Sequence, residues 1–178
     1  MKPAIQPING IILLNKERGI SSNRALQNIK KYLYPTITVI SLALIDNLTK
    51  YYVRIENIQE LVLIENFLTI DLTYNTGIAF GFLSDYTNTT YVVSLLVLVW
   101  LVFQIKDSKN SSLELYSYIL ILGGALGNLS ERGWNLVTNN GGKVTDFVEL
   151  LFIPSFNFAD SLISIGITIL LFSEFKNK

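Results

Sequence analysis

The run TTYVVSLLVLVWLVFQIK at residues 89–106 carries a single charged side chain, and that side chain is its last residue. A helix needs about 17–25 mostly apolar residues to cross the hydrocarbon core of a bilayer. This run therefore predicts a transmembrane helix. The rest of the chain agrees, because 50% of its 178 residues are hydrophobic, 16% are charged and the mean hydropathy is +0.41, unlike an average soluble protein.

Three further stretches have the length and composition of membrane spans. They are residues 34–53 (YPTITVISLALIDNLTKYYV), 113–129 (LELYSYILILGGALGNL) and 158–175 (FADSLISIGITILLFSEF). Residues 54–88 partly alternate apolar and polar positions, which is typical of short strands. The expected fold class is thus an all-α membrane protein, with four transmembrane helices and a small extracytoplasmic β-rich segment between the first and second.

The Lys and Arg residues are distributed unevenly around the four expected spans. Ten of the fourteen lie before the first span, between the second and third, or after the fourth. The other four are Lys50, Arg54, Arg132 and Lys143. Because cytoplasmic loops carry the excess of basic side chains, both termini are expected in the cytoplasm and the two longer loops outside.

The residue types that are missing limit the chemistry. The chain has no Cys and no His, which excludes disulfides, thiolate nucleophiles, Cys/His zinc sites and Ser-His-Asp triads. Acid–base chemistry is left to Asp, Glu, Lys or Tyr. A formal net charge of zero gives no support for nucleic-acid binding. No metal, cofactor or obligatory oligomer is indicated, so a monomer without cofactors is expected.

Two acidic residues flank the start of the last expected span. Asp146 lies in KVTDFVEL and Asp160 in FNFADSLI, with Pro154 between them to interrupt a continuous helix. The intervening chain can fold back and bring both carboxyl groups together at the outer membrane surface. Two close carboxyl groups share one proton, so one can activate water while the other polarises a carbonyl. The alternative is that each Asp is a surface or helix-capping residue.

Four segments in order, IDNLTKYYV, NTGIAFGFL, GGALGNLSER and VTDF…FNFADSLI, extend over residues 45–163. This ordered set resembles the lipoprotein signal peptidase (signal peptidase II) family, an aspartic peptidase family of the bacterial inner membrane. The resemblance implies cleavage of prolipoproteins just before a diacylglyceryl-modified Cys, at the outer face of the cytoplasmic membrane. It also implies that Asp146 and Asp160 are the catalytic residues, with the prolipoprotein and membrane lipids as partners.

The resemblance implies a substrate-binding role for four further residues. Asn75 matches an Asn of the substrate site, although it could instead be a turn residue before Gly77. Arg132 could hold a substrate carbonyl or orient a catalytic carboxylate. Asn157 is expected to support the acidic pair. For Asn128 and Asn157, hydrogen bonds that pack the helices together are an equal alternative.

Asp46 and Lys50 stand four residues apart in the first expected span, on one side of a helix. We expect a mutual, structural ion pair, and a second role in placing the substrate is the alternative.

The chain departs from the family pattern at Glu131, where Asp is usual, and at Asn47, where Gln is common. The connection from 132 to 146 is also several residues longer than usual.

Residues 9–33 resemble the N-terminal segment of the tRNA pseudouridine synthase B family through the run NKERGISSN and the helix-like sequence after it. That family's Gly-x-Leu-Asp-Pro type catalytic run does not occur in this chain. We therefore expect residues 1–35 to be a cytoplasmic appendage without pseudouridine chemistry, and residues 36–178 to be the membrane peptidase domain. A basic tail that enforces topology is the alternative.

Two other classes of protein remain as alternatives. One is a catalytically inactive four-helix membrane protein that binds a lipidated partner. The other is a small transporter, in which Asp and Lys residues within the membrane would relay ions. The sequence of a transporter is expected to show charges spread through several spans, or inverted repeats. The acidic residues of this chain instead gather at one membrane face. The pattern favours proteolysis at the membrane surface.

Overall fold

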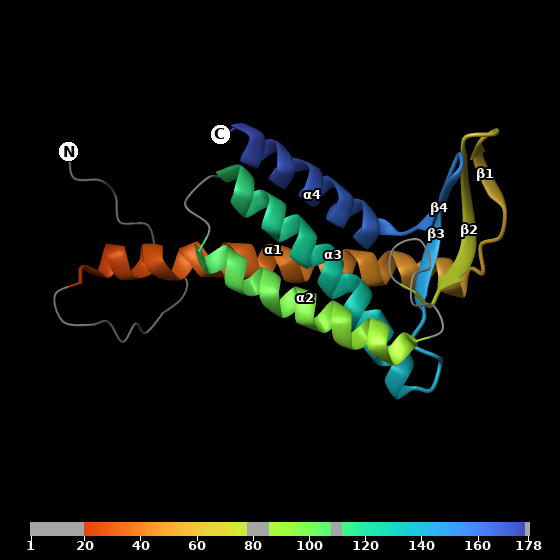
Figure 1. The fold of residues 1–178 in the computed structure, drawn as a ribbon, viewed down its shortest axis with the longest axis horizontal. Coiled ribbons are helices and arrows are strands. Elements are labelled where there is room, and N and C mark those ends of the chain that lie inside the picture. The colour runs from red at the N-terminus through yellow and green to blue at the C-terminus, as the bar shows by residue number, and fades with distance from the viewer. Residues whose placement is uncertain (1–19, 78–85, 108–111, 177–178) are drawn as a thin grey trace, which may run out of the picture. The chain divides into compact units, whose positions relative to one another are not determined.

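The computed structural model describes residues 20–77, 86–107 and 112–176. Within these ranges the chain forms four α-helices and four β-strands (Figure 1). The chain divides into two compact units, Met1–Pro35 and Thr36–Lys178. The second unit contains all the residues of the candidate site.

The described helices are α1 (Ser22–Ile55), α2 (Thr87–Asp107), α3 (Ser112–Val137) and α4 (Phe158–Lys176). The bounds of α2 and α4 agree with the spans expected at 89–106 and 158–175. Helix α1 begins well before residue 34, because Pro35 does not end it and the hydroxyl of Ser21 caps its first turn by accepting the Arg24 N–H at 3.2 Å. Helix α3 continues two turns beyond residue 129.

The distribution of polarity in the described residues is typical of a membrane protein. Among the described helices, two are long and apolar enough to cross a membrane, at Thr87–Ile105 and Phe158–Lys176. Their large apolar side chains face outward, as at Leu96, Trp100 and Phe172. Charged and polar side chains, in contrast, are buried between the elements. Such an arrangement is stable where the surroundings are lipid.

Small residues of α3 let the neighbouring helices approach closely. A Cβ atom added at Gly124 would lie 2.4 Å from the backbone oxygen of Ala159 in α4. A Cβ atom added at Gly127 would lie 2.6 Å from Oδ2 of Asp46 in α1. These contacts bring the start of α4 and the charged part of α1 against the same stretch of α3. The site is assembled there.

The strands form one antiparallel sheet in the order β1-β2-β3-β4. Strands β1 (Leu61–Ile64) and β2 (Leu68–Asn75) lie in the stretch where the sequence predicts strands, but β3 (Val144–Leu150) and β4 (Ile153–Phe156) come from between α3 and α4. The prediction of a β-rich segment only between the first two helices is therefore incomplete. The register pairs Thr73 of β2 with Asp146 of β3. Within the second unit, the sheet lies at the end where α1 finishes and α4 begins (Figure 1).

Candidate active site

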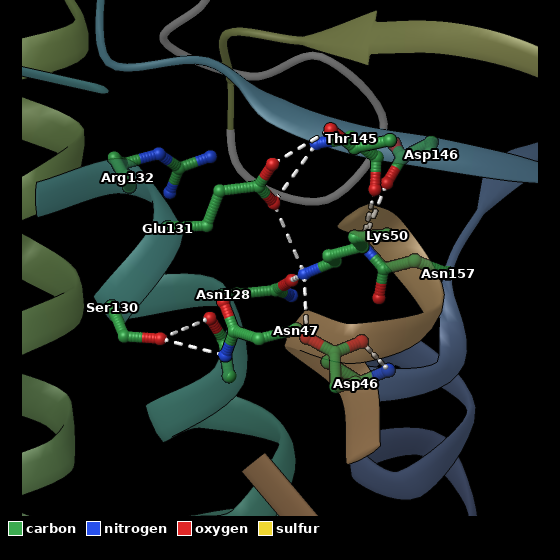
Figure 2. A network of polar contacts seen from close by, with 12 residues as sticks. Asp46, Asn47, Lys50, Asn128, Ser130, Glu131, Arg132, Thr145, Asp146 and Asn157 are labelled. Carbon is green, nitrogen blue, oxygen red and sulfur yellow. Dashed lines mark hydrogen bonds and ion pairs between the residues drawn. The ribbon is translucent and has the colours of Figure 1, made fainter. Parts of the chain in front are cut away.

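Asp146 and Asp160 come together through Asn157. Asp146 projects from β3, and Asp160 lies in the first turn of α4. The side-chain amide of Asn157 donates to Oδ1 of Asp146 at 2.7 Å, and its backbone N–H donates to Oδ2 of Asp160 at 3.2 Å. One residue thus bonds both carboxyl groups, and both line a single cavity. Figure 2 shows the contact between Asn157 and Asp146.

The start of α4 fixes Asp160 by a reciprocal cap. Asn157 precedes the helix, and its Oδ1 accepts the N–H of Asp160 at 2.9 Å. Asp160, three residues later, accepts the N–H of Asn157 in return. This is a capping box, with Asn and Asp in place of the usual Ser or Thr and Glu. The Asp46 carboxylate adds a third contact by accepting the N–H of Ala159 at 2.8 Å. Because three bonds define the first turn, the direction of Asp160 is set by the backbone.

Three asparagines direct their amide N–H groups toward the acidic pair. The amide oxygen of Asn75 accepts the Gly77 N–H at 2.9 Å, and that of Asn157 accepts the Asp160 N–H. The amide oxygen of Asn128 accepts from Lys50 at 2.6 Å. Because each amide oxygen already accepts a hydrogen bond, the NH₂ group of each Asn is the part of the amide that can donate to a carboxyl. The NH₂ group of Asn128 donates to Oδ1 of Asp160 at 2.8 Å.

The environment of Asp146 favours its protonated form. Burial, and next the negative charge of Asp160, raise the pKa of Asp146 from its ordinary value of 3.8 to about 7. Hydrogen bonds from Asn75 and Asn157 and the charge of Lys50 oppose this rise. The side chain is 2% exposed, so desolvation of the charged form dominates. Asp146 can therefore carry a proton near neutral pH and still lose it readily.

Arg132 contacts neither carboxylate directly. Its guanidinium donates to the backbone oxygens of Gly142 at 3.1 Å and Gly77 at 2.6 Å. The side chain is buried, and it lines the cavity beside the acidic pair. Arg132 thus ties together the two loops that lead out of β2 and into β3. Its positive charge lies close to the pair while its hydrogen bonds are used on the backbone.

A cluster of buried charges lies behind the acidic pair. The Nζ atom of Lys50 is 2.7 Å from Oδ2 of Asp46 and 3.3 Å from Oε2 of Glu131 (Figure 2). Arg54 also pairs with Glu131. The expected proximity of Asp46 and Lys50 is therefore observed, and both side chains are fully buried. A buried ammonium beside carboxylates is partly relieved of its desolvation cost.

Sequence reasoning missed the role of Glu131 and Thr145. The carboxylate of Glu131 accepts the backbone N–H of Thr145 at 3.1 Å and its hydroxyl at 2.6 Å (Figure 2). Arg54 donates to the same hydroxyl at 2.9 Å. Thr145 immediately precedes Asp146, so these bonds fix the entry of β3 into the site. The available signal is an ionisable residue just after the third expected span, which comparison with the family motif marks only as a departure.

The cavity next to the pair has a volume of about 460 Å³. Its polar lining includes Asp146, Asp160 and Arg132. Its apolar lining comes from three helices and includes Val93, Val97, Ala125, Leu129, Ile163 and Ile167. Strand β4 supplies the rest of one wall. Such a cavity suits a ligand with a long apolar part and a polar group that must reach the carboxyls.

In the parts of the chain that the structure describes, no three His, Cys, Asp or Glu side chains gather so as to hold a metal ion. The polar groups that line the cavity include the two carboxyls, the asparagine amides around them and Arg132. With one carboxyl protonated and one ionised, this set can move a proton in each direction across a bound carbonyl.

Two neighbouring carboxyls beside a largely apolar cavity, in a protein whose helices have an apolar exterior, define a membrane enzyme of the aspartic type. The chain belongs to the signal peptidase (SPase) II family, whose model matches residues 38–176. This confirms the resemblance found in the four sequence motifs. The resemblance of residues 9–33 to tRNA pseudouridine synthase B stays a prediction.

Named relatives agree with this membership. A lipoprotein signal peptidase of Pseudomonas syringae pv. tomato is 33% identical over 88% of this chain and 92% of its own length. One of Staphylococcus haemolyticus is 33% identical over 84% of this chain and 97% of its own. A solved bacterial membrane enzyme structure is similar with a TM-score of 0.72 at 26% identity, covering 82% of this chain and 90% of that one.

Proposed function

We propose that this peptidase removes signal peptides from diacylglyceryl-modified prolipoproteins, with Asp146 and Asp160 as the catalytic pair. The observation that carries the proposal is the single Asn157 side chain and backbone bonded to both carboxyls, at 2.7 Å and 3.2 Å. Membership of the signal peptidase II family supports the substrate class. The adjoining apolar cavity of about 460 Å³ is suited to the acyl chains of a lipidated cysteine.

In the proposed mechanism Asp160 is the base and Asp146 the acid. The Asp160 carboxylate takes a proton from water as the water oxygen bonds to the scissile carbonyl carbon, and Asp146 gives its proton to the carbonyl oxygen. Asp160 then protonates the leaving nitrogen as the C–N bond breaks. Asp146 recovers its proton from a hydroxyl of the intermediate, which leaves a carboxylic acid and an amine. Both carboxyls return to their starting states without a covalent intermediate.

The assignment of acid and base follows from the donors around each group. Asp160 accepts N–H donors on both oxygens, from Asn128 at 2.8 Å and from the Asn157 backbone at 3.2 Å. That pattern suits a carboxylate, which only accepts. Asp146 is buried and its pKa is raised to about 7. It is therefore the member of the pair that holds the proton before the reaction.

Four residues are proposed to line the substrate site. Asn75, Asn128 and Asn157 orient the carboxyls through their amides and present polar groups to the cavity. Arg132 holds the loop at Gly77 and keeps a positive charge near the developing oxyanion. Two of its five N–H donors are bonded to backbone oxygens, so others remain for a substrate carbonyl.

The chain is a protein of the bacterial inner membrane. We propose that α1 and α3 cross the bilayer together with α2 and α4, giving four spans. Both termini would then be cytoplasmic, and the sheet and acidic pair would lie at the outer face, as the distribution of basic residues predicts. Residues 36–178 would form the peptidase domain, and residues 1–35 a cytoplasmic appendage without pseudouridine chemistry. We propose that the protein acts as a monomer with lipids around it.

The activity is tested with purified protein in lipid vesicles and a prolipoprotein prepared with and without the diacylglyceryl group. We expect cleavage just before the modified Cys and no cleavage of the unmodified substrate. Binding of the lipidated substrate without cleavage would favour the inactive, partner-binding alternative. Cleavage of both substrates at equal rates would contradict the proposed substrate class.

A further inference from the structure

Lys50 is fully buried and has a neutral partner in addition to its carboxylates. Its Nζ lies 2.7 Å from Asp46 Oδ2, 3.3 Å from Glu131 Oε2 and 2.6 Å from Oδ1 of Asn128. The contact with the amide is the shortest of the three. A purely structural ion pair between Asp46 and Lys50 does not require it.

The contact with Asn128 fixes which way that amide points. An ammonium group has three donors and no acceptor, so only the oxygen of the amide can face it. A second donor, Asn157 Nδ2, reaches the same oxygen at 3.1 Å. The NH₂ group of Asn128 must then lie on the opposite side, where it donates to Asp160 Oδ1 at 2.8 Å. The buried cation therefore reaches Asp160 through one intervening amide.

We propose that Lys50 is a positioning residue for the reaction, whose ammonium holds the Asn128 amide with its NH₂ group toward Asp160 and so keeps that carboxyl ready to act as the base. This inference rests on the catalytic roles proposed above for the two carboxyls. Lys50 does not line the cavity, so it acts through Asn128 and not on the substrate.

Without the ammonium, the Asn128 oxygen loses its shortest contact and keeps only the donor from Asn157 Nδ2 at 3.1 Å, so the amide can turn more readily. With the amide turned, Asp160 would lose the N–H donor on its Oδ1 and would face an acceptor in its place. A carboxylate that is no longer held in position is a poorer base toward water. Other charged groups lie near the pair, namely Asp46 and Arg54 from α1 and Glu131 and Arg132 from α3. Removing Lys50 alone therefore changes the charge around the pair as well as the hold on the amide.

The test compares Lys50→Met with the double variant Lys50→Met/Asp46→Asn in lipid vesicles. Lys50→Met leaves a buried carboxylate without its cation and lowers stability. The double variant restores the balance of charge, and Asn at position 46 can still accept the Ala159 N–H through its amide oxygen. We expect both variants to lose about 10²-fold or more in kcat, the low end of a general base's contribution, with KM nearly unchanged. Lys143→Met, which removes a lysine that contacts Tyr74, is the matched control and keeps its kcat.

A second measurement, on Asn128→Asp, does not depend on the folding of a Lys50 variant. Asn128→Asp keeps an oxygen for Lys50 but removes the NH₂ group that faces Asp160, so kcat should fall comparably. In an Asn128→Ala background, Lys50→Met should reduce kcat little further, because its effect passes through that amide. Wild-type kcat in the charge-balanced double variant or in Asn128→Asp, or an undiminished effect of Lys50→Met without Asn128, would overturn the inference. Retained cleavage in Asp160→Asn would instead overturn the catalytic assignment on which it rests.

Discussion

Each carboxyl of the acidic pair is surrounded by asparagine amides whose oxygens are already bonded elsewhere. An amide N–H donates a hydrogen bond to a carboxylate but carries no net charge. It therefore holds the carboxyl in place and favours the ionised form less strongly than a cation does. A direct Arg contact would instead hold Asp146 ionised. The hydrogen bonds described for Arg132 go to the oxygens of Gly77 and Gly142 and not to Asp146. The pKa of Asp146 can therefore rise to about 7, which leaves one carboxyl able to donate a proton.

The first prediction concerns pH. The mechanism needs Asp146 protonated, and burial with the nearby Asp160 charge puts its pKa at about 7. Asp146 carries its proton below that pH and loses it above, so kcat/KM should fall as the pH rises through about 7. The profile is measured by initial rates of cleavage from pH 5 to pH 9 in vesicles. A rate that rises steadily to pH 9 would mean that the ionised form of Asp146 is the active one.

The second prediction concerns Glu131, which binds Thr145 and pairs with Lys50 and Arg54. Glu131→Gln removes the charge from a buried network and should lower the free energy of unfolding by about 3 kcal/mol. The activity should fall as well, because the entry of β3 and hence Asp146 is no longer fixed. Thermal unfolding in detergent and cleavage rates measure the two effects.

Glu149→Gln is the matched control for this substitution. Glu149 lies on β3, the strand to which Glu131 binds through Thr145, and accepts from the hydroxyl of Ser155 at 3.1 Å, but it is only part-buried. Its neutralisation should change stability by well under about 1 kcal/mol and leave cleavage intact. Equal losses of stability in the two variants would remove the special role assigned to Glu131.

At the level of elements, the meeting of α3 with α4 carries the third prediction. A methyl group at Gly124 would lie 2.4 Å from the backbone oxygen of Ala159, the residue before Asp160. Backbone cannot rotate away as a side chain can, so Gly124→Ala should push the start of α4 aside. We expect a loss of about 1–3 kcal/mol in stability together with a loss of kcat, measured by thermal unfolding and cleavage.

Gly141→Ala provides the comparison. Gly141 has a φ of +75°, and a Cβ there would meet nothing within 4 Å. Its substitution strains the backbone by about 1–2 kcal/mol and does not displace a catalytic element. Activity close to wild type in Gly141→Ala is therefore expected. A Gly124→Ala protein as active as wild type would show that the close approach of the two helices is not needed for the site.

How far the sequence predicts these elements depends on the kind of signal. Residues 89–106 and 158–175 are long apolar runs, and the bilayer length rule gives α2 and α4 almost to the residue. Strand β3 was missed because its seven residues, VTDFVEL, are stabilised by pairing with β2, which lies far away in the chain. Local patterns do not contain such long-range pairing. The sequence predicts only that Pro154 interrupts a continuous helix, whereas the structure places it within the edge strand β4, where a missing N–H is tolerated.

The candidate site likewise combines features that the sequence predicts with contacts that it does not predict. The proximity of Asp146 and Asp160 was predicted from their spacing and from the family motifs. The contacts of Glu131 with Thr145 and of Lys50 with Asn128 join residues 14 and 78 positions apart. Contacts of that range depend on the packing of α1 and β3 against α3. Residue types alone could indicate that such charges need partners, but not which partners they have.

At the scale of the whole molecule, polarity is the reverse of that in a soluble protein. Among the described residues, buried side chains include Asp46, Lys50, Glu131 and Asp146, whereas Leu48 is 65% and Phe103 59% exposed. In water, such apolar exposure would drive association. In a bilayer the apolar side chains contact lipid, and the buried polar groups hold the helices together. The membrane is therefore part of what makes this fold stable.

The fourth prediction tests the proposed orientation in that membrane. The chain contains no Cys, so single cysteines can be introduced without background. Asn140→Cys, in the turn that precedes β3, should react with a membrane-impermeant maleimide added outside intact cells. Ser108→Cys, between the second and third spans expected from sequence, should react only after the membrane is opened. Labelling of position 108 from outside would reverse the topology and move the acidic pair to the cytoplasmic face.

The most direct test of the central claim is single-turnover cleavage of a diacylglyceryl-modified prolipoprotein by Asp146→Asn and Asp160→Asn. Asp146→Asn should fold at least as well as wild type at pH 8. Because the pKa of Asp146 is raised to about 7 in the folded protein, ionisation of this carboxyl lowers the folding stability, and the loss grows as the pH rises from 4 to about 7. Both variants should bind substrate, remain folded and lose cleavage by about 10³-fold or more. Cleavage near the wild-type rate by either folded variant would contradict the claim that these two carboxyls perform the hydrolysis.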